Sequence, residues 1–299
     1  MMKKVLFVVN PKSGKATIKN TVLSIVDLFT QNGYLTTVYT TQRSKDATEI
    51  VKQIGGQYDV IACAGGDGTL DEVVTGIWES KLNVPIGYIP SGSTNDFAIS
   101  LGIPFDHLQA ADAIMRGSVF LCDVGCFNDT IFMYIAAFGA FTEVSYSTPQ
   151  QSKNVLGHLA YILEGMKSLS SITDYHVKLE YEDTVIEDDI IYGMVTNSLS
   201  VGGMKRFRNE NIDFDDGLFE VVLIKQPKNA IELQATLAAL LRDELDNEYM
   251  YYVQASKLTI SSEQEIPWTL DGEFGGNHKE VTIINRRQSI GIYRNMGIS

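Results

Sequence analysis

Short apolar runs alternate with helical patterns over the first 125 or so residues of this 299-residue chain, and this alternation constrains the fold most. The strand-like runs are Lys4–Val9, Leu35–Thr40, Val60–Cys63 and Pro85–Ile89, and the helical patterns are Ile18–Thr30, Asp46–Ile54, Leu70–Glu79 and Leu108–Met115. Strands separated by helices favour a parallel sheet that is covered on both faces. We therefore expect an N-terminal α/β domain over residues 1–124.

From about Val124 the pattern changes to strand-like segments with few helices between them. The strand-like segments are Thr130–Phe138, His176–Tyr181, Thr184–Thr196, Phe219–Ile224, Lys257–Ser261 and Val281–Asn285, and the helical ones are Leu156–Leu169 and Lys228–Leu241. This pattern predicts a largely antiparallel β-sandwich domain over residues 125–288. It leaves open whether residues 289–299 complete the first domain.

Three polar turns that contain glycine directly follow expected strands of the first domain: Asn10–Lys15, Gly65–Thr69 and Pro90–Asp96. In parallel sheets, ligands bind beyond the carboxyl ends of the strands, so we expect the three turns to share one site. The middle turn, Gly-Gly-Asp-Gly-Thr, has more glycine than a tight turn requires. Glycine lets a ligand approach the main chain, and the following helix N-terminus suits phosphate. The carboxylate of Asp67 would repel a bare phosphate, and a bound magnesium ion or a ribose would remove that conflict.

Other polar segments have two interpretations each. The turn at 10–15 lacks Walker spacing, so it is either a set of phosphate donors or a turn in which Ser13 caps a helix. The acidic segment 213–220 is either a magnesium or calcium site or a solvated loop. In the segment 268–274, Asp271 or Glu273 is either a general base toward a hydroxyl or part of a hairpin turn built on Asp-Gly.

Composition narrows the function classes. A formal net charge of −13 argues against nucleic-acid binding. Three cysteines in or beside apolar runs indicate reduced thiols of a cytosolic protein, and no segment approaches the roughly 20 apolar residues of a membrane-spanning helix. The four histidines show no metal-binding spacing, and the absence of a Gly-x-Ser-x-Gly motif argues against a hydrolase.

In this order, the motifs resemble the diacylglycerol kinase-like lipid kinase family, of the soluble bacterial type, over nearly the whole chain. They are Asn-Pro-x-Ser-Gly at 10–14, Gly-Gly-Asp-Gly-Thr-x-x-Glu at 65–72, Gly-Ser-x-Asn-Asp-Phe-Ala at 92–98, Asp-Asp-Gly-Leu-Phe-Glu at 215–220 and Leu-Asp-Gly-Glu at 270–273. Gly-Gly-Asp-Gly-Thr alone is shared with NAD kinases and phosphofructokinases. The run from Asn95 to Pro104 is the part that points to the lipid branch.

The resemblance implies a two-domain kinase with its active site in the interdomain cleft. Such an enzyme would transfer the γ-phosphate of ATP, with Mg²⁺, to the hydroxyl of diacylglycerol or a related lipid. It would be cytoplasmic, would associate transiently with a membrane surface, would bind no nucleic acid, and could form a homodimer.

The resemblance also implies roles for individual residues. The nucleotide-binding residues would be Asn10, Pro11, Lys12, Ser13, Gly14, Thr41, Gly66, Asp67, Gly68, Thr69, Leu70, Asp71, Glu72 and Ser93. Asp271 would be the base, with Glu273 beside it, and Asp67 would help organise the catalytic magnesium and its waters. Asp213, Asp216 and the Leu218 carbonyl would hold a structural magnesium.

Some positions depart from the family pattern. Asp71 and Thr75 stand where asparagine is usual, and Ser93 stands where threonine is usual. The segment 197–207 lacks the usual longer glycine run and proline, which leaves the lipid acceptor open, and its residues 204–207 suit either a membrane-edge loop or a plain surface loop.

Two alternative functions remain. A soluble small-molecule kinase such as NAD kinase predicts Asn-Glu where this chain has Asn95-Asp96. A non-catalytic lipid-sensing module is the second, and the intact Asp67, Asp271 and Glu273 argue against it.

Overall fold

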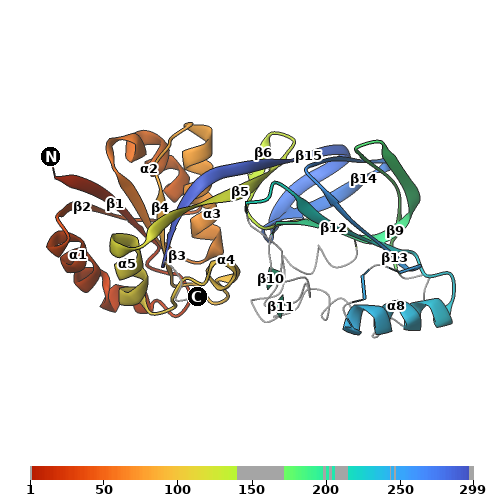
Figure 1. Ribbon diagram of the computed structural model, residues 1–299, viewed down its shortest axis with the longest axis horizontal. Helices are drawn as coiled ribbons and strands as arrows, with labels where there is room; N and C mark the ends of the chain where they lie inside the picture. Colours follow the sequence, from red (N-terminus) through yellow and green to blue (C-terminus); the bar gives the residue numbers. More distant parts are fainter. Residues whose placement is uncertain are drawn as a thin grey trace. The chain divides into compact units, whose positions relative to one another are not determined.

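The computed structural model describes residues 2–139, 172–197, 200–201, 204–205, 215–242, 244–245 and 247–295. The chain divides into two compact units, the first made of Met1–Cys122 with Gln288–Ser299 and the second of Asp123–Arg287 (Figure 1). The expected helix Leu156–Leu169 and the expected metal ligand Asp213 lie outside the described residues. Within the described part of the chain, no helix has the length and apolarity needed to cross a membrane.

The first unit is an α/β unit with a parallel sheet. Its strands lie in the order β2 (Tyr34–Thr40), β1 (Lys3–Val9), β3 (Val60–Gly65) and β4 (Ile86–Pro90), and all neighbours are parallel. The end of β15 (Glu273–Arg294) adds a further parallel strand through Ile292, which pairs with Ile86 of β4. The end of β15 therefore joins this sheet at Ile292, and Gln288–Ser299 group with the first unit.

Helices cover both faces of the sheet. They are α1 (Val22–Gln31), α2 (Asp46–Ile54), α3 (Asp67–Glu79), α4 (Asp96–Leu101) and α5 (His107–Arg116), with short 3₁₀ turns η1 (Thr17–Asn20) and η2 (Gly55–Gln57). Helices α1 and α5 pack on one side and α2 and α3 on the other (Figure 1). Strands β1 and β3 are consequently buried on both faces, which explains their continuous apolar sequence.

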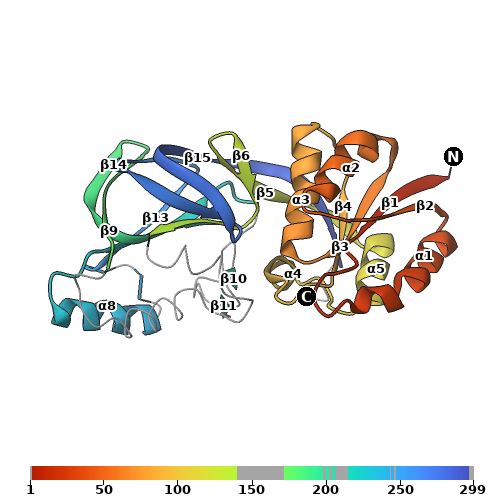
Figure 2. The same cartoon turned by 180° about the vertical axis from the view of Figure 1, so that it is seen from behind.

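The second unit is built mainly of antiparallel strands. They are the end of β5 (Ser118–Phe127), β6 (Thr130–Phe132), β7 (Ile135–Gly139), β8 (Tyr175–Tyr181), β9 (Thr184–Thr196), β10 (Ser200–Val201), β11 (Met204–Lys205), β12 (Phe219–Lys225), β13 (Met250–Ala255), β14 (Lys257–Leu270) and most of β15, with helix α8 (Ala230–Arg242). Figure 2 shows β9, β13, β14 and β15 from behind. Aromatic side chains, including Trp268, Phe138 and Phe127, fill the core.

Strand pairing in this unit differs from the two separate sheets of the expected sandwich. Strands β9 and β14 each pair with both β7 and β8, so these four strands form a path that closes on itself. The long strand β14 makes this possible because its residues 259–261 pair with β8 and its residues 268–270 pair with β7. The expected single strand Thr130–Phe138 is also interrupted, at Met133 and Tyr134.

Candidate active site

The three polar turns of the first unit meet at the carboxyl edge of its sheet. Asn10 donates from Nδ2 to Thr69 Oγ1 at 3.0 Å, which joins the first turn to the second. The Ser91 N–H donates to the Gly65 carbonyl at 2.8 Å, which joins the second turn to the third. A Cβ atom added at Gly14 would lie only 2.5 Å from the Ser91 carbonyl oxygen, so the first and third turns also touch.

Most of the glycines in these turns are required by the packing of the turns on one another. Gly14 has a φ of +52°, and a Cβ at Gly92 would lie 2.5 Å from the Cα of Gly66. A Cβ at Gly65 would collide with the Thr69 side chain at 2.4 Å. Gly68 is different, because it is exposed and a Cβ there would have no protein atom within 4 Å. The packing therefore explains Gly65 and Gly66 and leaves Gly68 as the glycine that a ligand would explain.

Helix α3 begins at Asp67 in the middle of these turns. Its N-cap is Gly66, which has an extended backbone and no side chain, so no side chain caps the first turn. Most of the first N–H groups of a helix have no partner within it, and they carry the positive end of the helix dipole. In α3 the Thr69 N–H already donates to the Gly66 carbonyl at 3.0 Å. This end of α3, with the exposed Gly68, is therefore an environment suited to a phosphate group.

The carboxylate of Asp67 is bonded to the start of another helix. Its two oxygens accept hydrogen bonds from the backbone N–H groups of Asp96 at 3.1 Å and Phe97 at 3.3 Å, which are the first residues of α4. Burial raises the pKa of Asp67, and the backbone donors, with Phe97 the strongest, oppose that effect. Asp67 thus holds the third turn against the second, in addition to the magnesium role that the sequence predicts.

Asn95 shapes the third turn and was not among the predicted residues. It is 3% exposed and has a left-handed backbone with φ of +53°. Its Oδ1 accepts from the Gly92 N–H at 2.9 Å and from the Tyr88 hydroxyl at 3.3 Å, and its Nδ2 donates to the Gly92 carbonyl at 3.0 Å. Asparagine tolerates the left-handed region better than most residues, and this preference is the signal that could have identified it.

The side chain of Glu72 supports helix α2. Its carboxylate accepts the backbone N–H groups of Lys45 at 2.8 Å and Ala47 at 3.1 Å. Thr41 precedes this segment, is buried, and donates its N–H to the Val9 carbonyl at 2.9 Å. Glu72 therefore contacts the segment that follows Thr41, so it fixes the start of α2 at this edge of the sheet.

The other predicted nucleotide-binding residues differ in exposure. Lys12, Gly14, Gly68 and Ser93 are exposed, Pro11, Gly66 and Asp71 are half-buried, and Ser13, Thr69 and Leu70 are buried. Because Leu70 is 1% exposed, its side chain belongs to the core and only its main chain could meet a ligand.

In the second unit, Asp271 lies in the two-residue turn between β14 and β15. Its φ is +49° and that of Gly272 is +88°, and Leu270 pairs with Glu273 on either side, so the hairpin interpretation describes the backbone correctly. Its carboxylate accepts three backbone N–H groups, from Met133 at 2.5 Å, Tyr134 at 3.0 Å and Ile135 at 2.9 Å. These donors fix the carboxylate and favour its ionised form. Glu273 is exposed beside it.

Two of the three predicted metal ligands of the acidic loop, Asp216 and the Leu218 carbonyl, lie among the described residues. Asp216 accepts the Leu218 N–H at 2.8 Å, and the Leu218 carbonyl accepts from Asn285 Nδ2 at 3.1 Å. Among the described residues, no three His, Cys, Asp or Glu side chains form a group that could hold a metal ion. Asp216 and the Leu218 carbonyl are hard oxygen donors of the type magnesium prefers, but they would need Asp213, which lies outside the described residues, as a third ligand.

Glu220 is the last residue of the acidic segment 213–220, and the sequence assigned it no role of its own. It is 1% exposed, and burial raises its pKa to about 7. Its Oε1 accepts from Gln254 Nε2 at 3.3 Å, while its Oε2 has no hydrogen-bond partner among the described residues. A buried carboxylate of this kind is costly for stability.

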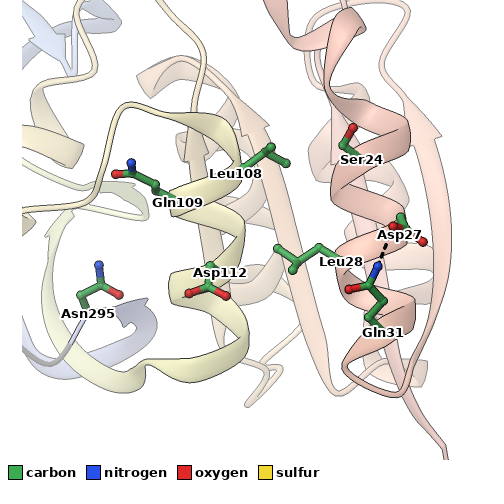
Figure 3. Close-up of a pocket in the computed structure, with 8 residues that line it drawn as sticks. All are labelled: Ser24, Asp27, Leu28, Gln31, Leu108, Gln109, Asp112 and Asn295. Atoms are coloured by element: carbon green, nitrogen blue, oxygen red, sulfur yellow. Dashed lines mark hydrogen bonds between the residues drawn. The ribbon is translucent and has the colours of Figure 1, made fainter.

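A pocket of about 480 Å³ lies between α1 and α5 (Figure 3). It is lined by Ser24, Asp27, Leu28, Gln31, Leu108, Gln109, Asp112 and Asn295. Both of its carboxylates already have partners, because Asp27 accepts from Gln31 at 2.7 Å and Asp112 pairs with Arg116 at 2.8 Å. None of the predicted site residues lines this pocket, so we do not place the candidate site there despite its volume.

Comparisons with known proteins identify both units. Residues 4–127 match the family model of the diacylglycerol kinase catalytic domain, and residues 137–285 match that of the YegS C-terminal NAD kinase beta sandwich-like domain. The chain is 34% identical to the diacylglycerol kinase of Bacillus subtilis (strain 168), over 92% of this chain and 91% of that protein. It is also 34% identical to the diacylglycerol kinase of Staphylococcus carnosus (strain TM300), over 98% and 95% of the two chains.

A crystal structure of a diacylglycerol kinase from Bacillus anthracis strain Sterne has the same fold. It superposes with a TM-score of 0.77 at 24% identity, over 100% of this chain and 99% of that chain. The relatives at 34% identity confirm the family resemblance of the sequence motifs. This chain belongs to the diacylglycerol kinase family.

Proposed function

We propose that this protein is a lipid kinase that transfers the γ-phosphate of ATP to the hydroxyl of diacylglycerol or a related lipid at a membrane surface. Family membership supports a kinase, and the curated relatives are named diacylglycerol kinases. The observation that carries the nucleotide half of the proposal is the meeting of three polar turns at the start of α3, where Gly68 leaves the main chain open.

The nucleotide would lie over these turns. The N–H groups at the start of α3 would face its phosphates, beside the exposed Lys12 and Ser93 and beside Thr41, which follows the end of β2. The side chain of Asn10 would act indirectly, because its Oδ1 accepts the Lys12 N–H at 3.0 Å while its Nδ2 bonds Thr69. The turn would therefore reach the nucleotide already ordered, which lowers the entropic cost of binding.

Asp271 would act on the lipid hydroxyl. The three N–H groups orient the carboxylate, which would accept the hydroxyl proton while the hydroxyl oxygen forms a bond to the γ-phosphorus. The bond between the γ-phosphorus and the bridging oxygen breaks, and ADP leaves. Phosphoryl transfer depends mainly on positioning and charge neutralisation. Magnesium, when bound, would supply part of that neutralisation. The carboxylate of Asp67 would help to organise the magnesium ion and its waters.

The experiment is a transfer assay with labelled ATP, magnesium and mixed micelles that contain one lipid alcohol at a time. We expect label in diacylglycerol or a close relative, and binding to lipid vesicles in a sedimentation assay. A parallel reaction with NAD tests the soluble small-molecule alternative. Label in NAD and in no lipid would replace the proposal, and no label in any lipid of the panel would contradict it.

A further inference from the structure

Thr196, the last residue of strand β9, is connected to the carboxylate of Asp271 through the peptide groups of Tyr134. The N–H of Tyr134 donates to Asp271 Oδ1 at 3.0 Å. On the other side of the same residue, the Tyr134 carbonyl accepts from Thr196 Oγ1 at 2.7 Å and from the N–H of the next residue, Asn197, at 3.0 Å. The end of β9 thus holds the turn whose amides hold Asp271.

The position of Thr196 makes this connection rigid. Its side chain is fully buried, and its backbone lies between two neighbouring strands, paired with Ile135 of β7 and Glu220 of β12. Asn197 is 2% exposed and donates from Nδ2 to the Asp123 carbonyl at 3.2 Å, which attaches the same corner to β5. A hydroxyl at this place is not explained by packing, because a valine would fill the same volume.

The turn that Thr196 braces consists of Met133 and Tyr134, the two residues between β6 and β7. It contacts Asp271 on one side and the end of β9 on the other. A further contact, from the Tyr134 hydroxyl to the Asp271 carbonyl at 3.2 Å, also joins the turn to the hairpin. A displacement of Tyr134 would therefore move the Asp271 carboxylate directly.

We infer that Thr196 is a positioning residue for Asp271, acting through the Tyr134 peptide groups. The inference rests on the proposed role of Asp271 as the base. Its functional consequence is a change in turnover rather than in substrate binding, because a carboxylate shifted by a fraction of an ångström affects the transition state most.

Thr196→Val is the variant that tests it, because valine keeps the shape and the β-branching and removes only the hydroxyl. Thr236→Val is the matched control, since Thr236 is also buried and its Oγ1 donates to a backbone carbonyl, that of Glu232, at 2.9 Å within α8. In the lipid transfer assay we expect kcat of Thr196→Val to fall about 10-fold with KM values within about twofold of wild type. Thr236→Val should retain the wild-type kcat, and Thr196→Ser should restore most of the loss.

Amide hydrogen exchange supplies a readout that does not depend on activity. The amides of Tyr134 and Ile135 should exchange about 10-fold faster in Thr196→Val and at the wild-type rate in Thr236→Val. Unchanged exchange at these amides, or a kcat of Thr196→Val equal to that of Thr236→Val, would overturn the inference while the kinase proposal stands. A wild-type enzyme that labels no lipid would defeat the kinase proposal, and the role assigned here to Thr196 would fall with it.

Discussion

The two units present their candidate site residues in opposite ways. In the first unit the site is made of main chain, since glycine turns pack on one another at the start of α3 and leave Gly68 open. In the second unit it is a single side chain, the carboxylate of Asp271, held by three amides. A main-chain site depends on its glycines, some for packing and Gly68 for ligand access, whereas a carboxylate site depends on donors that stay aligned. Glycine substitutions and isosteric carboxylate substitutions therefore test different units.

The largest effect is expected for Asp271→Asn. The amide keeps the shape but cannot accept a proton, and one of its ends would place N–H groups against a backbone donor. We expect kcat to fall by about 10²–10⁴ and the free energy of unfolding to fall by about 1–3 kcal/mol. Steady-state kinetics and thermal unfolding measure the two effects separately.

Asp183→Asn is the matched control for this variant. Asp183 lies in the two-residue turn between β8 and β9, where Tyr181 pairs with Thr184, and it is exposed. The same chemical change in another hairpin of the same unit should leave both kcat and the melting temperature unchanged. A normal kcat for Asp271→Asn would remove Asp271 from the role of base.

A pair of glycine substitutions tests the main-chain site. In Gly92→Ala the new Cβ would meet the Cα of Gly66 at 2.5 Å, so we expect the free energy of unfolding to fall by about 1–3 kcal/mol. In Gly68→Ala the new Cβ has open space, so stability should change by less than about 1 kcal/mol. The KM for ATP of Gly68→Ala should nevertheless rise about 10-fold, because the methyl group occupies the approach of a phosphate.

Thermal unfolding and ATP kinetics on both variants separate the two roles of glycine. A Gly68→Ala enzyme with the wild-type KM for ATP would show that the start of α3 is not where the phosphates bind. Equal stability of Gly92→Ala and Gly68→Ala would contradict the close packing of the second and third turns.

The smallest expected effect is on the pH dependence of stability, to which one histidine in each unit contributes. His107, whose Nδ1 lies 2.9 Å from Thr21 Oγ1, has its pKa lowered from 6.5 by burial. His176 has its pKa raised from 6.5 by hydrogen bonds to Asp189 at 2.8 Å and Glu187 at 3.0 Å. The stability supplied by His107 should therefore be lost as the pH falls below 6.5, and that supplied by His176 should be lost as the pH rises through its raised pKa.

Variants at the two positions should consequently respond to pH in opposite directions. We compare the melting temperature of each variant with that of wild type as the pH falls from 8 to 5.5. This difference should rise for His107→Gln and fall for His176→Gln. Because His176 is exposed, its effect should be small and should weaken with added salt. If this difference changed in the same direction with pH in both variants, the opposite pKa shifts of the two histidines would be contradicted.

Much of the first unit could be predicted from the sequence. The alternation of strands and helices predicts a parallel sheet, and the turns after the first, third and fourth strands then share one edge for geometric reasons, as Asn10 and Thr69 do. The partners of the carboxylates could not be predicted. Asp67 binds amides 29 and 30 residues away, and Asp271 binds amides 136 to 138 residues away. Backbone donors have no residue-specific signal, so no motif marks them.

The sequence by itself determined the unit in which each motif lies, because this follows from residue order and periodicity. Its motifs resemble the diacylglycerol kinase family, and the relatives at 34% identity confirm that resemblance. Only the tertiary structure decided what individual residues do within the motifs. It assigned Glu72 to the support of α2, showed that Gly65 and Gly66 serve packing while Gly68 remains open, and closed the strands of the second unit through β9 and β14. These outcomes depend on contacts between segments far apart in the chain, and such contacts exist only after the strands have found their neighbours.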